Sequence, residues 1–159
     1  MPDIPGDGKT RTDWVPAIAN KNAPTVAELN AGIRVSQWMT ADGAVGFRPE
    51  TADVPTSGAE DTFDTATNGR RSYSGTLLRF KKQSGSDVVY TTMTPDTAGF
   101  IVRRKSMAAA TAYASGQPVQ VYPVICGETA WMDDEPNTVE RFEVPLKMTA
   151  QPSLRAVVA

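Results

Sequence analysis

The chain has 159 residues, enough for one domain with a hydrophobic core, and its formal charge of −2 argues against a surface dedicated to nucleic acid. It has no histidine and a single cysteine, Cys126, which excludes His-based catalysis, His metal ligands, an intrachain disulfide and a zinc–thiolate cluster. No secretory signal and no apolar run of roughly 20 residues is present, so we expect no membrane association.

The N-terminal segment raises the question of a nucleotide site. Gly8-Lys9-Thr10 resembles the end of a phosphate-binding loop, but the motif requires a glycine where Asp3 stands. It also requires a strand before the loop and a helix after it, and Pro16 pushes the preceding residue toward an extended conformation. We interpret residues 1–16 as an irregular N-terminal arm without nucleotide chemistry.

The first regular elements follow this segment. Thr25 and Glu28 have the spacing of a capping box, which predicts a helix of about two turns over residues 25–31. Residues 33–39 alternate apolar and polar side chains, which indicates a strand. Residues 40–69 are rich in Gly, Pro and small polar residues, and we predict a long inter-strand loop there, a feature that is usually functional in a compact domain.

The second half of the sequence contains most of the strand signals. The run over 138–150 is the most regular, because apolar residues occupy one face and charged residues the other. Pro145 falls on the polar face and has no N–H to donate, so we expect this strand to be at an edge or irregular there. We predict further strands over 70–82, 99–105 and 118–126, and a short helix over 87–93.

These elements define a fold class. They predict a mainly β protein, a β-sandwich or barrel-like sheet pair with one or two short flanking helices. We expect one domain over 1–159, ending in a C-terminal extension over 150–159. Cys126 lies in the apolar run of the predicted strand 118–126, so we expect a buried, unreactive thiol.

Two acidic motifs bear on metal and hydrolytic chemistry. Asp64 to Gly69 resembles half of an EF-hand loop, but Ala66 stands where an oxygen ligand is needed and Gly75 where a bidentate Glu is needed. An Asn-Gly turn is the better interpretation. Asp133 to Glu135 has no base or metal framework nearby, and no pattern of cleft residues supports a two-carboxylate hydrolase. We predict no catalytic residue, no cofactor and no metal site.

The charge pattern instead favours contacts between copies of the chain. The predicted loop is acidic and the following strand is basic, which suits an acidic loop of one copy against a basic strand of another better than nucleic-acid binding. Apolar residues of the N-terminal arm and the loop add anchors for such contacts. The predicted interface residues are Ile4, Trp14, Val15, Phe47, Glu50, Asp53, Glu60, Asp61, Phe63, Asp64, Arg70, Arg71, Arg79, Lys81 and Lys82.

Longer phrases of the sequence resemble a known family. "PGDGKTRTDWVPAIANKNAPTVAELNAGIRVS", "GFRPETADVPTS", "GTLLRFKKQSG" and "NTVERFEVPLKMTAQPSLRAVVA" resemble segments of major tail proteins, the tail-tube subunits of long-tailed, non-contractile bacteriophages, particularly those that infect actinobacteria. The resemblance extends over nearly the whole chain. It implies a virion protein without catalytic residues.

The same resemblance implies how the protein works. It implies a β-sandwich with a flanking helix, assembled in the host cytoplasm into hexameric rings that stack into a tube through which DNA passes without specific binding. Implied partners are other copies of the chain, a tape measure protein, and tail tip and terminator proteins. Two alternatives stay open at this point: a capsid decoration protein or other structural β domain, and a DNA-binding protein that uses the basic strand 70–82.

Overall fold

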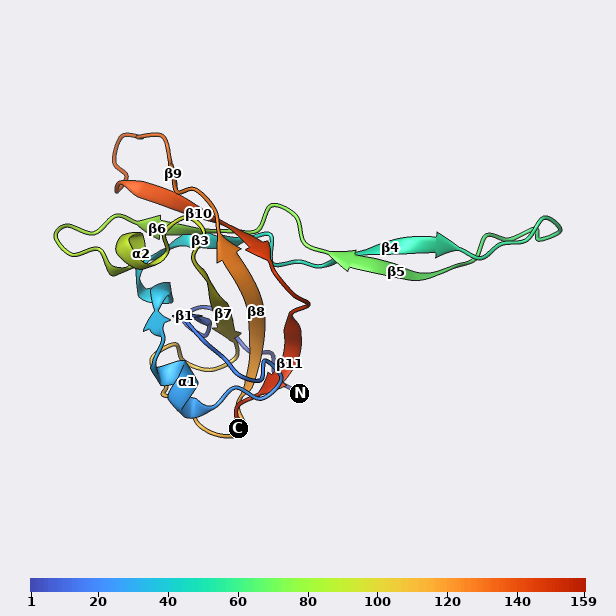
Figure 1. Cartoon of the computed structure of the whole chain (residues 1–159), viewed down its shortest axis with the longest axis horizontal. Helices are drawn as coiled ribbons and strands as arrows, with labels where there is room; N and C mark the ends of the chain where they lie inside the picture. Colours follow the sequence, from blue (N-terminus) through green and yellow to red (C-terminus); the bar gives the residue numbers. More distant parts are fainter.

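The computed structural model describes residues 1–159 and consists mainly of β-strands (Figure 1). This confirms the predicted fold class, a mainly β protein with short helices beside the sheet. The helices are α1 (Val26–Asn30), the 3₁₀-helix η1 (Val35–Trp38) and α2 (Val88–Thr92). The strands are β1 (Arg11–Val15), β2 (Ile33–Arg34), β3 (Met39–Val45), β4 (Glu50–Pro55), β5 (Ala66–Ser72), β6 (Leu77–Lys81), β7 (Ala98–Arg104), β8 (Pro118–Cys126), β9 (Ala130–Trp131), β10 (Arg141–Met148) and β11 (Ser153–Val157).

All strands except β4 and β5 belong to one curled sheet with two halves (Figure 1). In the first half, β8 pairs with β7 along one edge and with β11 and then β10 along the other, while β1 and β2 extend the sheet beyond β7. In the second half, β10 pairs with β6 and β9, and β6 pairs with β3. Because β10 belongs to both halves, the sheet folds over on itself and encloses a core.

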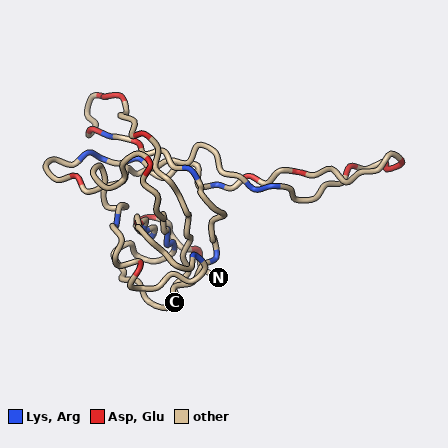
Figure 2. Tube along the Cα trace, in the orientation of Figure 1, with Lys and Arg blue, Asp and Glu red and all other residues tan.

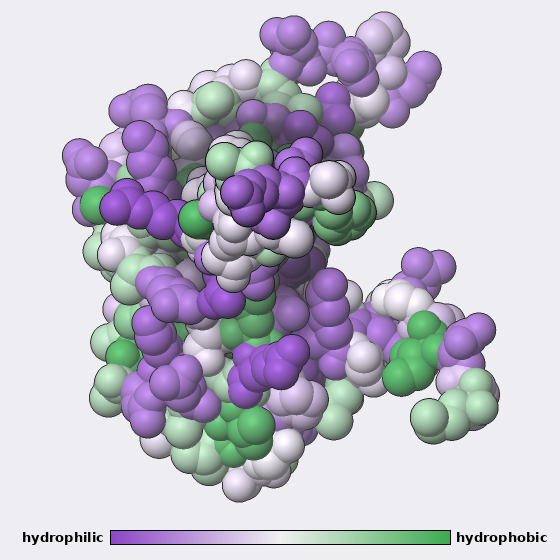
Figure 3. Space-filling model, turned by 90° about the vertical axis from the view of Figure 1, so that its right-hand side faces the viewer, coloured by the Kyte–Doolittle hydropathy of each residue, from purple (hydrophilic) through white to green (hydrophobic).

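The chain between β3 and β6 leaves the body as a long two-stranded arm, residues 50–72, made of β4, β5 and the arm tip 57–64 (Figure 1, Figure 2). The long inter-strand loop predicted over 40–69 is therefore wrong in part, since β3 already begins this segment and β4 pairs with β5. Alternation did not reveal these strands because neither face of the arm is buried. Viewed along the arm, this side of the molecule is mostly hydrophilic (Figure 3).

The predicted single strand over 70–82 consists of two strands. β5 ends the arm and β6 belongs to the body, and residues 73–76 connect them. Gly75 in this connection has a φ of +64°, which interrupts an extended strand and is a conformation that glycine adopts easily. The arm and the body are therefore separate structural units at this point of the chain.

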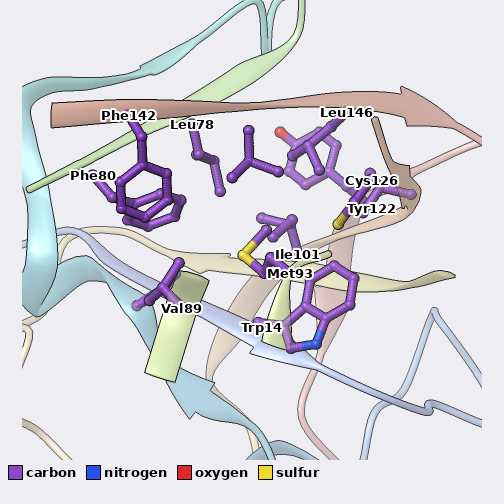
Figure 4. Close-up of a cluster of buried hydrophobic side chains, with 13 residues drawn as sticks. Trp14, Leu78, Phe80, Val89, Met93, Ile101, Tyr122, Cys126, Phe142 and Leu146 are labelled. Atoms are coloured by element: carbon purple, nitrogen blue, oxygen red, sulfur yellow. The ribbon is translucent and has the colours of Figure 1, made fainter. Parts of the chain in front are cut away.

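The main hydrophobic core lies between the two halves of the sheet (Figure 4). Alternate residues of β6, β8 and β10 point into it from above and below, as the period of a strand requires. Trp14 of β1 and Ile101 of β7 close it from the first half, Val89 of α2 lies toward one end, and Met93 lies in the middle of the cluster. Cys126 is 2% exposed in this core, which confirms the buried thiol, and burial raises its pKa to about 11.

A second core covers the opposite face of the first half of the sheet. Val15 of β1, Val102 of β7 and Val121 of β8 point into it, and α1 adds the fully buried Leu29. The last residues of the chain complete it with Val158, which is 2% exposed. The first half of the sheet is thus buried on both faces, which explains why β8 is a nearly continuous apolar run.

The two predictions about the chain ends are wrong in part. Residues 11–15 form a strand of the sheet, and Trp14 and Val15 are 2% and 0% exposed in the two cores, so they are not subunit contacts. Residues 150–159 contain β11, which pairs with β8, and they are not an extension. When both faces of a strand are buried, apolar residues follow one another and do not alternate with polar ones. The sequence pattern therefore did not show that β1 is buried on both sides.

The predicted strand over 33–39 is also wrong in part. β2 pairs with β1 over only two residues, and the chain then turns through η1, whose Val35 is buried in the main core. Gly32 lies so close to β1 that a Cβ atom there would stand 2.6 Å from the Trp14 carbonyl oxygen. From this close contact β2 runs alongside β1, and the chain then turns through η1 into β3 of the second half of the sheet.

Both predicted helices are confirmed. The Thr25 hydroxyl accepts from the N–H of Glu28 at 3.2 Å, and the Glu28 carboxylate accepts from the N–H of Thr25 at 2.9 Å, which is the predicted capping box of α1. The N–H of Ala19 and that of Thr25 donate to Glu28 and hold its pKa below the ordinary value. Asp87 caps α2 by accepting from the N–H of Tyr90 at 3.0 Å.

The other predicted strands are confirmed as β7, β8 and β10. Pro145 lies inside the sheet and not at its edge. Along one side of β10, the residues before Pro145 pair with β9 and the residues after it pair with β8. The N–H of Gly127 donates to the Pro145 carbonyl at 2.8 Å across this break. The missing N–H of a proline is tolerated here because regular pairing is interrupted at the same position.

Candidate assembly surfaces

The arm carries more than half of the residues that the sequence assigns to subunit contacts. All of them are exposed, and the tip presents Phe63 with 79% of its surface open. No ion pair within the chain involves an arm residue, so its charges are free to meet a partner. The predicted contact residues on the arm are Glu50 and Asp53 of β4, Glu60, Asp61, Phe63 and Asp64 of the tip, and Arg70 and Arg71 of β5.

The arm has no core of its own. Every residue of β4 is exposed, as is every residue of β5 except Gly69. The ribbon is held by backbone pairing and, near the tip, by hydroxyl contacts such as that between Thr56 and Thr65 at 2.7 Å. An isolated two-stranded hairpin is marginal in water, and its unpaired edges attract other strands. The arm therefore gains stability from any partner that covers it.

Two glycines mark the root of the arm, one on the segment that enters the arm and one on the segment that leaves it. Gly46 and Gly75 have φ values of +76° and +64°, and the Thr76 hydroxyl donates to the Gly46 carbonyl at 2.8 Å. A Cβ atom at Gly46 would stand 2.6 Å from the backbone carbon of Gly75, whereas a Cβ atom at Gly75 would meet nothing within 4 Å. Gly46 is thus required both by its conformation and by close packing.

Two predicted contact bases are already paired within the body. Arg79 donates to Glu143 at 2.8 Å and to Asp42 at 3.1 Å on the outer face of the second half of the sheet. The Lys82 ammonium lies 3.3 Å from Asp87. These two bases already have acidic partners in their own chain, and their contact with the acids of another copy stays a prediction. The bases of this segment without an ion pair are Arg70, Arg71 and Lys81.

Two predicted apolar contact residues have different surroundings. Phe47, at the root of the arm, is partly buried against the main core, edge-on to Tyr122 with 5.0 Å between ring centroids. The Arg103 guanidinium lies 5.0 Å from the centre of the same ring. Phe47 therefore fastens the root of the arm to the body. Ile4 is 61% exposed in the segment before β1 and stays available for contacts.

Sequence reasoning missed a buried polar cluster beside the second core. Arg104 is fully buried, and it donates to three carbonyl oxygens of the loop 105–117 and to Gln117, at 2.7 to 3.3 Å. Arg11 pairs with the buried carboxylate of Asp13 at 2.9 Å. The sequence signal that could have revealed this cluster was a charged residue in a predicted strand, close to apolar residues of the same strand. These groups shape the loop rather than offer a binding site.

The acidic motifs form no metal site in the structure. No three side chains of His, Cys, Asp or Glu come together as a group that could hold a metal ion. The run from Asp133 to Glu135 lies exposed in the loop before β10, where Glu135 pairs with Arg141 at 3.4 Å. Neither of the two α-helices has the length and apolar character needed to span a bilayer.

Comparison with models of protein families shows which family has this sequence pattern. Residues 1–159 match the family described as "Phage tail tube protein". The chain belongs to this family. The tail tube family assignment covers the arm and both halves of the sheet, and it makes the protein a structural component of the phage tail and of the virion, which assembles with other tail components. The finding agrees with the resemblance seen in the sequence.

A solved structure shares the fold of this tail tube family member. The chain is similar to one in the "Cryo-EM structure of the anti-feeding prophage (AFP) baseplate, 6-fold symmetrised", with a TM-score of 0.64 over 98% of each chain. The two sequences are 8% identical, so the likeness concerns the fold alone. Comparison with curated proteins finds no match.

Proposed function

We propose that this tail tube subunit forms hexameric rings that stack into a hollow tube, and that the arm connects neighbouring subunits. The observation that carries the proposal is the arm itself. It places exposed acids, bases and an aromatic residue far from the body, and it has no core to hold it (Figure 2). Such a ribbon has little stability alone and gains it from surfaces that cover it.

The tube would serve as the conduit for DNA ejection into the host cell. A conduit must not grip phosphate, because each lysine or arginine contact adds attraction through the release of counterions. Arg79 on the outer face of the second half of the sheet is neutralised by Asp42 and Glu143, and Arg141 by Glu135. We expect assembled protein to bind duplex DNA weakly in a titration, and submicromolar binding at near-physiological salt contradicts the conduit role.

The tube needs proteins at its two ends and inside it. Each terminal ring exposes a face that rings within the tube cover, and this face suits the tail tip protein at one end and the terminator protein at the other. The lumen suits a tape measure protein during assembly. The family assignment supports these proposed partners, because a tail tube protein is a component of the virion tail. We propose that assembly takes place in the host cytoplasm.

Electron microscopy of the purified protein tests the proposal. Wild-type protein is expected to form tubes built of six-fold rings. Glu50 and Ser72 are paired across the root of the arm, so a two-residue Asn-Gly turn between them replaces residues 51–71 with a short hairpin. This armless variant is expected to keep the thermal stability of the body and to form no long tubes.

A second deletion serves as a matched comparison. Removal of residues 2–7 takes away exposed chain, including Ile4, and leaves β1 intact. We expect this variant to fold and to form fewer or shorter tubes. Long tubes from the armless variant contradict the role of the arm, and a wild-type protein that stays monomeric at every concentration contradicts the tube.

A further inference from the structure

A wide groove is lined by the root of the arm and by the chain that joins β10 to β11. Thr51, Gly69 and Ser72 of the arm line one side, and residues 149–155 line the other. Its volume is about 1740 Å³. Sites for small molecules usually have volumes of about 300–1,000 Å³, so this groove has the size for a folded segment of polypeptide.

The groove is positively charged. Four basic side chains line it against a single acid, Glu128. None of the four takes part in an ion pair within the chain, and Lys21 uses its ammonium group only on a backbone carbonyl. An acidic partner is therefore favoured. The four bases are Lys21, Arg71, Lys147 and Arg155.

The arm tip has the complementary chemistry. Glu60, Asp61 and Asp64 are exposed and form no ion pair in the chain, and Phe63 projects among them with 79% of its surface open. The groove offers Leu154, which is 38% exposed, as an apolar neighbour for an aromatic ring. A chain cannot fill its own groove, because the paired strands carry the tip away from the root (Figure 2).

We propose that this groove receives the arm tip of a second copy of the chain. The inference rests on the proposed function, and it names the two surfaces that meet. Tip and groove lie on different parts of one chain, so the contact is heterologous and repeats from copy to copy, as a growing assembly requires. The loop at Asp133 is the other acidic segment, but its Glu135 is already paired with Arg141.

Charge reversal tests the pairing of the two surfaces. Glu60→Lys with Asp64→Lys reverses the tip, and Lys147→Glu with Arg155→Glu reverses the groove. Exposed ion pairs are individually weak, so each double variant is expected to raise the protein concentration needed for tubes about tenfold. All four substitutions in one chain are expected to restore assembly. The thermal stability of each monomer should not change, because all four side chains are exposed.

Disulfide trapping tests the geometry without changing any charge. Thr62→Cys lies in the arm tip and Gln151→Cys lies in the groove, and both native residues are exposed. Cys126 is buried and does not compete. Mild oxidation of assembled protein should give a ladder of cross-linked multimers. The control pairs Thr62→Cys with Ser115→Cys, an exposed position outside the groove, and should give no ladder.

The outcomes separate this inference from the proposed function. Tubes that form normally but give no ladder from the tip and groove pair overturn the inference and leave the tube intact. Rescue of the groove reversal by Asp133→Lys with Asp134→Lys, in place of the tip reversal, also overturns it, because the groove then holds the other acidic loop. A wild-type protein that never assembles overturns both proposals.

Discussion

The body and the arm of this protein differ in how many of their side chains are buried within the chain. In the body, the first half of the sheet is buried on both faces, and its strands contribute to two separate cores. In the arm, no strand residue is buried, and the largest apolar side chain, Phe63, points into solvent. The body can therefore fold alone, whereas the arm is completed by a partner.

This difference predicts where a mutation acts. A large apolar side chain that is fully buried contributes about 1.5–3 kcal/mol to stability relative to an exposed one. Substitutions in the body should therefore change the free energy of unfolding of the monomer, and substitutions in the arm should change assembly.

Loss of Trp14 should lower the stability of the body the most. Its ring fills the main core and lies against Gly99, where a Cβ atom would collide with it. Trp14→Ala is expected to lower the free energy of unfolding by about 3–5 kcal/mol, measured by denaturant unfolding of the monomer. Phe63→Ala is the matched change in the arm and should leave this value unchanged. Equal losses from both variants contradict the division between body and arm.

Loss of Arg104 should have the next largest effect. Its guanidinium is fully buried and donates to three backbone carbonyls of the loop 105–117 and to Gln117, and its removal breaks all of these hydrogen bonds. Arg104→Met is expected to cost about 2–4 kcal/mol and to speed hydrogen exchange in this loop. Arg104→Lys should rescue little, because an ammonium group lacks the planar fork of donors. Full rescue by lysine contradicts this account.

The sequence predicted those parts of the fold that local signals specify. Thr25 and Glu28 form a capping box within four residues, so their pattern is complete without knowledge of the rest of the chain. The alternation in β10 is equally local, because one face of that strand is buried and the other is not. In both cases the physical cause lies within the window of sequence that was considered.

The remaining features depend on parts of the chain that are distant in sequence. Trp14 is buried because the second half of the sheet packs over one face of β1, and Val15 because α1 packs over the other, and no local pattern records these neighbours. The groove combines Lys21, Arg71 and Arg155, which come together only after the sheet has closed. The sequence did show that the segment around the arm is unusual and charged. It could not show which of its bases already had acids beside them.

Substitution of the two glycines at the root of the arm should have a smaller effect on stability, and the two positions can be compared directly. Gly46→Ala forces a left-handed conformation on a residue with a Cβ atom and brings that atom against the backbone of Gly75. Gly75→Ala imposes the conformational strain alone. We expect costs of about 1–3 kcal/mol for Gly46→Ala and about 1 kcal/mol for Gly75→Ala in thermal unfolding. Tube formation should fall more for Gly46→Ala, and equal effects contradict close packing at the root.

The smallest predicted effect concerns the charge of Glu28, which lies in the body and far from the arm. The N–H groups of Ala19 and Thr25 donate to its carboxylate and lower its pKa in the folded protein. A depressed pKa means that the charged form stabilises the fold above the unfolded pKa of about 4.3, and that this stabilisation disappears as the pH falls through the lower folded value.

Glu28→Gln removes the charge at the start of α1 and leaves one acceptor oxygen, where the carboxylate accepts from Ala19 at Oε1 and from Thr25 at Oε2. It should lower thermal stability near neutral pH by less than about 1 kcal/mol, because the carboxylate is close to solvent and the helix is short. The melting temperatures of wild type and variant should converge as the pH falls below the lowered folded pKa of Glu28, where both side chains are uncharged. A difference that stays constant with pH assigns the effect to the shape of the side chain instead of its charge. Assembly should be unchanged at neutral pH, since neither α1 nor its cap belongs to the arm or the groove.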